Sequence, residues 1–322
     1  MYLKPQSVFL AGNNFLQTKL CLSILKHCLV TAINLKCYYP MNKKTNQLKK
    51  YLRDNKCYYL PTCHDPLSAK LIESKGFKIS FIGGFALSSA ILGYPDASLI
   101  TQKELVDATY AICNHTKLPV IVDADTGFGG PANVYRTVKD LEAAGASALV
   151  LEDQIFPKKC ALTDQVLLLN LKEAKERLFI AIKAAKENKN ILVIARTDAL
   201  TLGSMGETLK RCLEYKKMGV DAVFMTGLNN LKQLKVIKDN IKGIPLMLNI
   251  TQNVKFNLKD VSKNKFKLAL FSQQILDGYI DSTKQTLDLI KKNKIPKYKN
   301  KAKDTLALLN YDKYLKLEKR KK

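Results

Sequence analysis

The chain has 322 residues, of which 47% are apolar, so it can form one large domain with a sizeable core. Its formal net charge of +25 raises the possibility of a nucleic-acid or anionic-membrane partner. The excess is concentrated at the two ends, however: residues 1–53 contain nine basic and no acidic residues, and residues 291–322 contain thirteen basic and three acidic ones. Because a nucleic-acid-binding protein is expected to carry its basic stripe on the folded surface, we expect no nucleic-acid partner.

The first 53 residues have the composition of an organelle transit peptide, because acidic residues are missing before Asp54. We therefore expect a basic N-terminal extension at 1–53 and a mitochondrial location, with a plastid-type organelle or the cytoplasm as alternatives. The apolar stretch 20–35 is interrupted by Lys26 and His27 and is too short to cross a bilayer, so we expect no membrane partner. The eight cysteines form no short CxxC pair, which is typical of thiols in a reducing compartment.

From Asp54 onward the pattern alternates between short apolar runs and amphipathic helices. We predict strands at 58–61, 79–82, 119–122, 148–152, 191–196, 222–225, 245–250 and 268–270. The predicted helices lie at 66–75, 86–92, 101–114, 133–144, 167–188, 207–218, 228–240, 272–292 and 304–319, with Thr101 and Glu104 forming a capping box.

Eight successive strand–helix units predict an α/β fold, a (β/α)8 TIM-type barrel over residues 54–292 with extra C-terminal helices. A weak repeat supports this, because Gly76, Gly145 and Gly219 each end a helix just before a strand. A doubly wound open sheet is the alternative, but no GxGxxG follows the first strand. Residues 293–322 are expected to form a basic helical tail.

Acidic residues follow two neighbouring predicted strands. Asp123 and Asp125 end the third strand, and Glu152 ends the fourth. Parallel strands present their carboxyl ends to one crevice, where clustered carboxylates repel one another unless a cation lies among them. A hard divalent cation, most simply Mg²⁺, is the predicted occupant. The alternative is that these acids cap helices or pair with lysines.

Other strand ends add polar groups to the same mouth. Arg196 is notable in a lysine-rich chain, because its planar guanidinium grips a carboxylate or phosphate in a way that lysine does not; the alternative is an arginine paired with Asp198 or Glu152. Gly83 and Gly84 let a ligand approach the backbone, although a simple turn has the same letters. Cys160 follows two lysines, which favour its thiolate, so it is a candidate for proton transfer.

At these residues the chain resembles the isocitrate lyase and phosphoenolpyruvate mutase superfamily, above all its methylisocitrate lyase and dimethylmalate lyase-like members. The matching stretches run in order between about residues 60 and 251: HDPLSAKLIESKGF, FIGGFALSSAILGYPD, PVIVDADTGFGG, LEDQIFPKKC, ARTDAL and LNIT. The resemblance implies a (β/α)8 barrel whose last helix packs on a neighbouring subunit, in a homotetramer or dimer. It also implies a small 2-hydroxy or 2-oxo carboxylic acid as substrate.

The resemblance also implies the site residues. Mg²⁺, with Mn²⁺ as an alternative ion, is expected to be held directly or through water by Asp96, Asp123, Asp125 and Glu152. The substrate is expected to contact Gly83, Gly84, Phe85, Arg196, Asn249 and Thr251. In the loop after the fourth strand, Lys159 and Cys160 are expected to act with Arg196 in catalysis.

Three departures from the family pattern concern the substrate rather than the metal. The lyases have Gly-His where this chain has Ala161 and Leu162, a serine at the position of Gly83, and a glutamate at the position of Thr226. We expect a Mg²⁺-dependent lyase that cleaves a methylisocitrate-like acid in a retro-aldol step. The alternatives are a 2-oxo-acid decarboxylase or hydrolase, a phosphonate mutase, or a catalytically impaired homologue.

Overall fold

The computed structural model describes residues 43–161 and 166–318 of the chain. Most of the predicted transit peptide, residues 1–42, and with it the sequence basis for the mitochondrial location, lies outside the described residues. Within those residues, no helix combines the length and apolar character needed to cross a bilayer.

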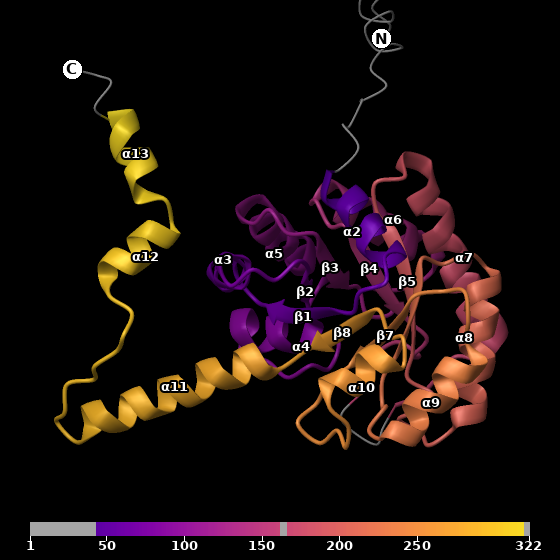
Figure 1. Cartoon of the computed structure of the whole chain (residues 1–322). Helices are drawn as coiled ribbons and strands as arrows, with labels where there is room; N and C mark the ends of the chain where they lie inside the picture. Colours follow the sequence, from indigo (N-terminus) through magenta and orange to yellow (C-terminus); the bar gives the residue numbers. More distant parts are fainter. Residues whose placement is uncertain (1–42, 162–165, 319–322) are drawn as a thin grey trace, which may run out of the picture. The chain divides into compact units, whose positions relative to one another are not determined.

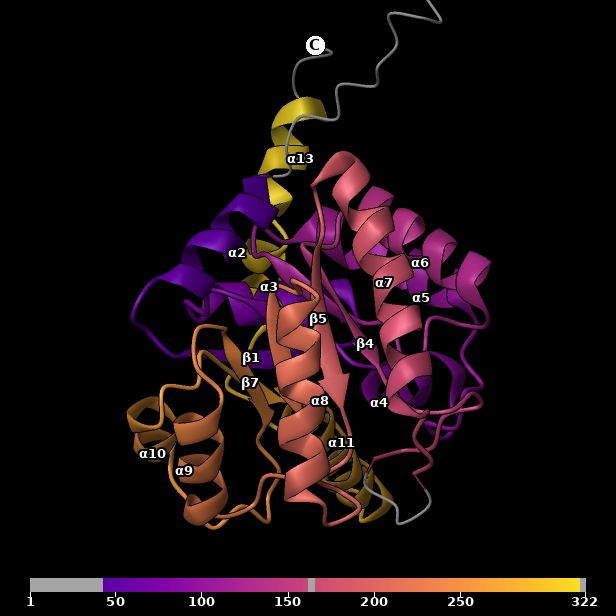
Figure 2. The same ribbon diagram turned by 90° about the vertical axis from the view of Figure 1, so that its right-hand side faces the viewer.

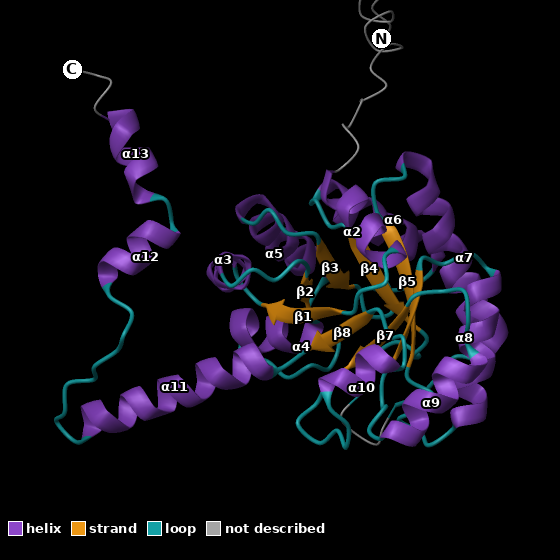
Figure 3. Ribbon diagram, in the orientation of Figure 1, coloured by secondary structure: helices purple, strands orange, loops and turns teal. Residues whose placement is uncertain are grey.

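Eight parallel strands close into a barrel, because the first strand pairs with the second and also with the eighth. The sequence predicted each of these strands, and the predicted barrel is confirmed. Figure 3 shows the strands at the centre with helices around them. The strands are β1 (Tyr58–Cys63), β2 (Ser80–Ile82), β3 (Val120–Asp123), β4 (Ala148–Glu152), β5 (Leu192–Thr197), β6 (Ala222–Met225), β7 (Leu246–Asn249) and β8 (Leu268–Phe271).

Helices connect the strands on the outside of the barrel. Figure 2 shows α7 and α8 running beside β5, which both contact. The predicted capping box at the start of α5 is present, because Glu104 N donates to the Thr101 side chain. The helices that follow β1 to β7 are α3 (Pro66–Ser74), α4 (Gly84–Leu87) with the π-helix η1 (Ser88–Leu92), α5 (Gln102–His115), α6 (Pro131–Ala143), α7 (Leu171–Asn188), α8 (Met205–Lys217), α9 (Leu231–Asn240) and α10 (Leu258–Lys263).

The helix α2 (Lys43–Arg53) lies within the segment that we assigned to the N-terminal extension (Figure 1). Leu48 and Leu52 are buried and share one apolar cluster with the inward-facing strand residues, so α2 belongs to the barrel core. Thr45 Oγ1 donates to Asn190 O at 2.6 Å, close to the start of β5. The helix therefore closes the barrel at the amino ends of the strands, which leaves the carboxyl ends open for a ligand.

The C-terminal segment differs from its prediction. β8 leads into α11 (Gln274–Lys291), in which Leu276 alone is buried among the residues that the structure describes. The single helix predicted at 304–319 is wrong: α12 (Ala302–Leu308) and α13 (Tyr311–Glu318) are separate helices. Asn310 between them has φ +58°, a left-handed conformation that asparagine tolerates and that ends a helix.

The loop after β6 contains a glycine whose replacement is expected to destabilise the fold. Gly227 has φ +86°, and a Cβ atom there would lie 2.9 Å from Thr201 N in the loop after β5. We expect Gly227→Ala to lower the free energy of unfolding by about 2–4 kcal/mol, from backbone strain and overpacking. Chemical denaturation measures this effect. Gly203→Ala is the matched control, because Gly203 has φ +79° but a Cβ atom there would meet no other atom within 4 Å. Equal losses in the two variants would contradict the steric explanation.

Candidate active site

A cavity of about 270 Å³ opens at the carboxyl ends of the strands. It brings together all the site residues predicted from the sequence except Asp125, Glu152 and Lys159, which do not line it. Its wall includes residues of β2, β3, β5, β6, β7 and β8 and of the loop after β4. The lining residues are Phe81, Gly83, Gly84, Phe85, Asp96, Asp123, Cys160, Ala161, Arg196, Phe224, Thr226, Gly227, Leu228, Asn229, Asn249, Thr251, Asn253, Leu270, Ser272 and Gln273.

The end of β3 and the turn after it supply two carboxylates, of which Asp123 lines the cavity. Asp123 is the last residue of β3, and its Oδ1 accepts a hydrogen bond from Asp125 N at 3.3 Å. Asp125 has φ +49°, an uncommon conformation for a residue other than glycine. Glu152 N at the end of β4 donates to Asp125 O at 2.9 Å, which fixes the two strand ends together. The acids on β3 and β4 therefore converge as the sequence predicted.

Arg196 near the end of β5 binds three carboxylates, those of Asp198, Asp123 and Glu152. Its Nε and Nη2 donate to the two oxygens of Asp198 at 2.8 and 2.9 Å. Its Nη1 lies 3.1 Å from Asp123 Oδ2 and 3.2 Å from Glu152 Oε2. The alternative prediction, that Arg196 is paired with Asp198 or Glu152, is confirmed. Arg196 also lines the cavity, so the two predicted roles are compatible.

Asp198 is itself held by two uncharged donors. Thr226 Oγ1 and Gln154 Nε2 each donate to it at 2.6 Å. Burial alone would raise the pKa of Asp198, but Arg196 and these hydrogen bonds lower it below its usual value. Thr226, where the lyases have a glutamate, thus completes the hydrogen bonding of the carboxylate that orients Arg196.

Lys158 places an ammonium group within the acidic cluster. Its Nζ lies 2.5 Å from Asp96 Oδ1 and 3.1 Å from Asp125 Oδ1, and its side chain is only 3% exposed. The sequence places Lys158 in the loop at the barrel mouth, but nothing in the local pattern shows where a loop side chain turns. The structure therefore adds the contacts of Lys158 with the acids, which the prediction did not contain.

The acidic groups carry more negative charge than the two basic groups balance. Burial raises the pKa of Asp125 to about 6, although Lys158 opposes the shift, and it raises the pKa of Asp123 despite Arg196. The pKa of Glu152 is raised well above its usual value, again chiefly by burial. Burial of several carboxylates with only two basic groups among them indicates a cluster that a further cation would stabilise.

The chemistry of these residues fits a magnesium ion. Glu152 Oε1 is buried and has no hydrogen-bond partner among residues 43–161 and 166–318. A Cβ atom on Gly84 would lie 3.1 Å from Asp125 Oδ1 and 3.5 Å from Asp96 Oδ1, so glycine keeps this space open. In the described part of the chain no three His, Cys, Asp or Glu side chains are grouped to coordinate an ion directly. The acids would therefore hold the ion partly through water, as is usual for Mg²⁺.

Lys158 and a divalent cation are expected to compete for Asp96 and Asp125. We predict that Lys158→Met raises the affinity for Mn²⁺ about tenfold or more, because a positive charge within 4 Å of the ligands is removed. Titration of free Mn²⁺ by electron paramagnetic resonance measures it. Lys159→Met is the control, because that side chain is exposed. Unchanged or weaker Mn²⁺ binding by Lys158→Met would show that the ammonium does not compete.

The two other predicted loop residues are placed differently from each other. Cys160 lines the cavity, as its predicted role in proton transfer requires. Lys159 has an exposed side chain, and its backbone N donates to Gln154 Oε1 at 2.9 Å. Its catalytic role stays a prediction. Leu162, the second residue of the pair that replaces Gly-His, lies outside the described residues.

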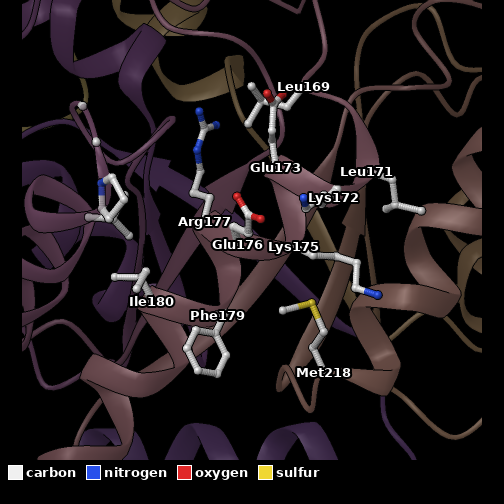
Figure 4. Close-up of a pocket in the computed structure, with 14 residues that line it drawn as sticks. Leu169, Leu171, Lys172, Glu173, Lys175, Glu176, Arg177, Phe179, Ile180 and Met218 are labelled. Atoms are coloured by element: carbon white, nitrogen blue, oxygen red, sulfur yellow. The ribbon is translucent and has the colours of Figure 1, made fainter.

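A second cavity, of about 860 Å³, shares no lining residue with the first (Figure 4). Its wall is formed by α6, the start of α7 and the end of α8, with Phe179, Ile180 and Met218 contributing apolar side chains. Arg177 reaches from this wall to the backbone carbonyls of Glu152 and Gln154, at 2.9 and 2.7 Å. Because none of the predicted site residues lines it, the smaller cavity is the candidate active site.

Comparison with known proteins identifies the family of the chain. The family described as phosphoenolpyruvate phosphomutase matches residues 48–290. The chain is 37% identical over 204 residues to 2,3-dimethylmalate lyase of Eubacterium barkeri, covering 62% of this chain and 69% of that protein. It is 31% identical over 250 residues to oxaloacetate decarboxylase of Rhodopseudomonas palustris (strain BisA53), covering 78% and 86%.

A solved structure of phosphonopyruvate hydrolase in complex with oxalate and Mg²⁺ superposes with a TM-score of 0.78 at 26% identity, covering 86% of this chain and 98% of that one. The family match spans the whole barrel, from α2 to α11. The chain belongs to the phosphoenolpyruvate phosphomutase family, within the PEP mutase/isocitrate lyase superfamily.

Proposed function

We propose that the chain is a Mg²⁺-dependent lyase that cleaves the carbon–carbon bond of a small 2-hydroxy acid in a retro-aldol step. The observation that carries this proposal is the meeting of Asp123, Arg196 and Cys160 around one cavity at the barrel mouth. A methylisocitrate-like acid is the substrate suggested by the sequence resemblance. When bound, Mg²⁺ or Mn²⁺ would supply positive charge that stabilises the oxyanion developing on the substrate.

The chain's own residues divide the remaining work. The backbone at Gly83, Gly84 and Phe85 lies open to the cavity and would bind the substrate carboxylate. Arg196, fixed by Asp198, would orient the carboxylates of Asp123 and Glu152 and add positive charge beside the reacting oxygen. A base at the cavity would take the proton of the substrate's 2-hydroxy group as the carbon–carbon bond breaks, and Cys160 would donate a proton to the carbon atom that is released. Asn249 and Thr251 would contact the far part of the substrate.

Decarboxylation of a 2-oxo acid is the second candidate. It needs the same stabilisation of negative charge next to a carboxylate, and the oxaloacetate decarboxylase relative matches a larger share of the chain than the dimethylmalate lyase does. A phosphonate mutase or hydrolase, or a catalytically impaired homologue, remains an alternative. Ala161 and Thr226, which differ from the family pattern, both line the cavity. The hydroxyl of Thr226 donates to Asp198 and not to the proposed metal ligands Asp96 and Asp125.

A substrate panel tests the proposal. We expect turnover of methylisocitrate to a 2-oxo product and succinate-like acid with Mg²⁺, and none after EDTA. Oxaloacetate and phosphonopyruvate are the comparison substrates, and release of pyruvate from either would favour the decarboxylase or hydrolase alternative. Turnover that persists in EDTA would contradict a metal-dependent reaction of any of these types.

A homodimer or homotetramer is also proposed. The helix α11 exposes apolar side chains along its length: Tyr279 is 59%, Leu287 59% and Ile290 55% exposed. An apolar face of this kind is expected to be covered by a second copy of the chain. Light scattering on the purified protein measures the number of copies.

A further inference from the structure

Gln154, which lies just beyond the end of β4, contacts two parts of the site at once, and the inference drawn from it rests on the proposed function. The residue is only 1% exposed. Its Nε2 donates to Asp198 Oδ2 at 2.6 Å, and its Oε1 accepts a hydrogen bond from Lys159 N at 2.9 Å. One buried amide therefore joins the carboxylate that orients Arg196 to the loop that carries Cys160.

The two contacts of Gln154 require an amide group. A backbone N–H can only donate, so the atom that faces Lys159 N must be an acceptor. Burial would raise the pKa of Asp198, but Arg196 and the hydrogen bonds to Asp198 lower it, so this group is a carboxylate that needs donors. Glutamine offers a donor and an acceptor at this length, whereas an ionised glutamate offers no donor.

The backbone at Gln154 is fixed separately from its side chain. Arg177 Nη1 donates to Gln154 O at 2.7 Å. The next residue, Ile155, donates its backbone N–H to Leu167 O at 2.8 Å. A substitution that changes only the side-chain amide should therefore leave the end of β4 in place.

The loop that carries Cys160 has a second anchor beside the one at Gln154. Lys158 Nζ lies 2.5 Å from Asp96 Oδ1 and 3.1 Å from Asp125 Oδ1. A cation that competes for these two acids would weaken the anchor at Lys158. The hydrogen bond to Gln154 does not involve them, so it would continue to hold the loop when the metal is bound.

We propose that Gln154 is a positioning residue that sets the place of Cys160 relative to Arg196 for proton donation to the substrate. Gln154 does not line the cavity, so it acts through the loop and not by touching the substrate. General acid catalysis needs its proton donor within hydrogen-bond reach of the reacting atom. Loss of the amide should therefore slow the reaction without weakening the binding of Mg²⁺ or oxalate.

Hydrogen exchange tests the link without any substrate. Methionine has nearly the length of glutamine but no strong hydrogen-bonding group. We expect Gln154→Met to speed exchange of the Lys159 amide about tenfold or more, because this amide loses its acceptor. Mass spectrometry with fragment ions resolves that amide. Equal exchange at Lys159 in the wild type and in Gln154→Met would overturn the proposal.

Thr226→Val is the matched control for the exchange measurement. It removes the other uncharged donor to Asp198 but leaves the hydrogen bond between Lys159 N and Gln154. Exchange at Lys159 should therefore stay at its wild-type rate. Equal acceleration in Thr226→Val and Gln154→Met would assign the effect to Asp198 and overturn the direct link to the loop.

Turnover tests the consequence for Cys160. We expect Gln154→Met to lower kcat about 10- to 100-fold, the cost of a misplaced catalytic group, with unchanged affinity for Mg²⁺ and oxalate. In a Cys160→Ser background the same substitution should have almost no further effect, because the group that Gln154 positions is already gone. Losses that multiply in the double variant would overturn the positioning role. If the wild-type protein turns over no substrate of the panel, the proposed function is contradicted, whereas the exchange comparison still decides whether Gln154 holds the loop.

Discussion

Asp123→Ala is expected to abolish Mg²⁺-dependent turnover, with a loss of about 10³-fold or more because charge stabilisation at the reacting oxygen disappears. Asp123 lines the cavity, binds Arg196 through Oδ2, and accepts the backbone hydrogen bond that sets the turn at Asp125. One substitution therefore removes a proposed metal ligand and loosens a second. Steady-state turnover at saturating Mg²⁺ measures the loss.

Two measurements separate this effect from misfolding. Arg196 keeps its two hydrogen bonds to Asp198 in the variant, so we expect circular dichroism to show a folded barrel. Asp107→Ala is the control, because Asp107 lies on the surface of α5. Among the described residues its only ion pair is with Lys103. Turnover by Asp123→Ala within tenfold of that control would remove Asp123 from the metal site.

Cys160→Ser is expected to lower turnover by about 10²- to 10⁴-fold, the range that general acid catalysis supplies. A serine hydroxyl is a much weaker acid than a thiol, so it donates a proton to the departing carbon less readily. Because serine keeps nearly the size of the Cys160 side chain at the cavity wall, affinity for Mg²⁺ and oxalate should be kept. A fall in kcat with unchanged oxalate binding is the expected pattern.

Cys57→Ser is the matched control for loss of a thiol. Cys57 precedes β1 at the amino end of the barrel, away from the mouth, and burial raises the pKa of its thiol to about 11. It should retain wild-type turnover. Full activity in Cys160→Ser would eliminate the proposed acid, whereas equal losses in both variants would point to a general effect of removing a thiol.

Much of the barrel could be predicted because its determinants are local. Buried parallel strands appear as apolar runs. Gly76, Gly145 and Gly219 follow the ends of helices as predicted, and each has a positive φ. The convergence of Asp123, Asp125 and Glu152 followed from topology, since strand carboxyl ends in a closed barrel share one mouth.

The remaining features depend on contacts that one sequence does not contain. The helix α2 was assigned to the extension because its charge resembles that of the preceding residues, whereas its place is decided by Leu48 and Leu52 packing inside the barrel. The pairing of Lys158 with the acids was missed for the same reason, because it depends on carboxylates far away in the chain. The break in the C-terminal helix had a signal in Asn310, which favours a left-handed conformation.

Calorimetric titration of oxalate into the protein, with Mg²⁺ and with EDTA, tests the central claim most directly. The acids at the mouth carry excess negative charge, so they should repel a dianion unless a divalent cation is bound among them. We predict binding with Mg²⁺, no binding in EDTA, and no binding by Asp123→Ala under either condition. Oxalate binding that is equally tight in EDTA, or unchanged in Asp123→Ala, would contradict a metal site at these acids.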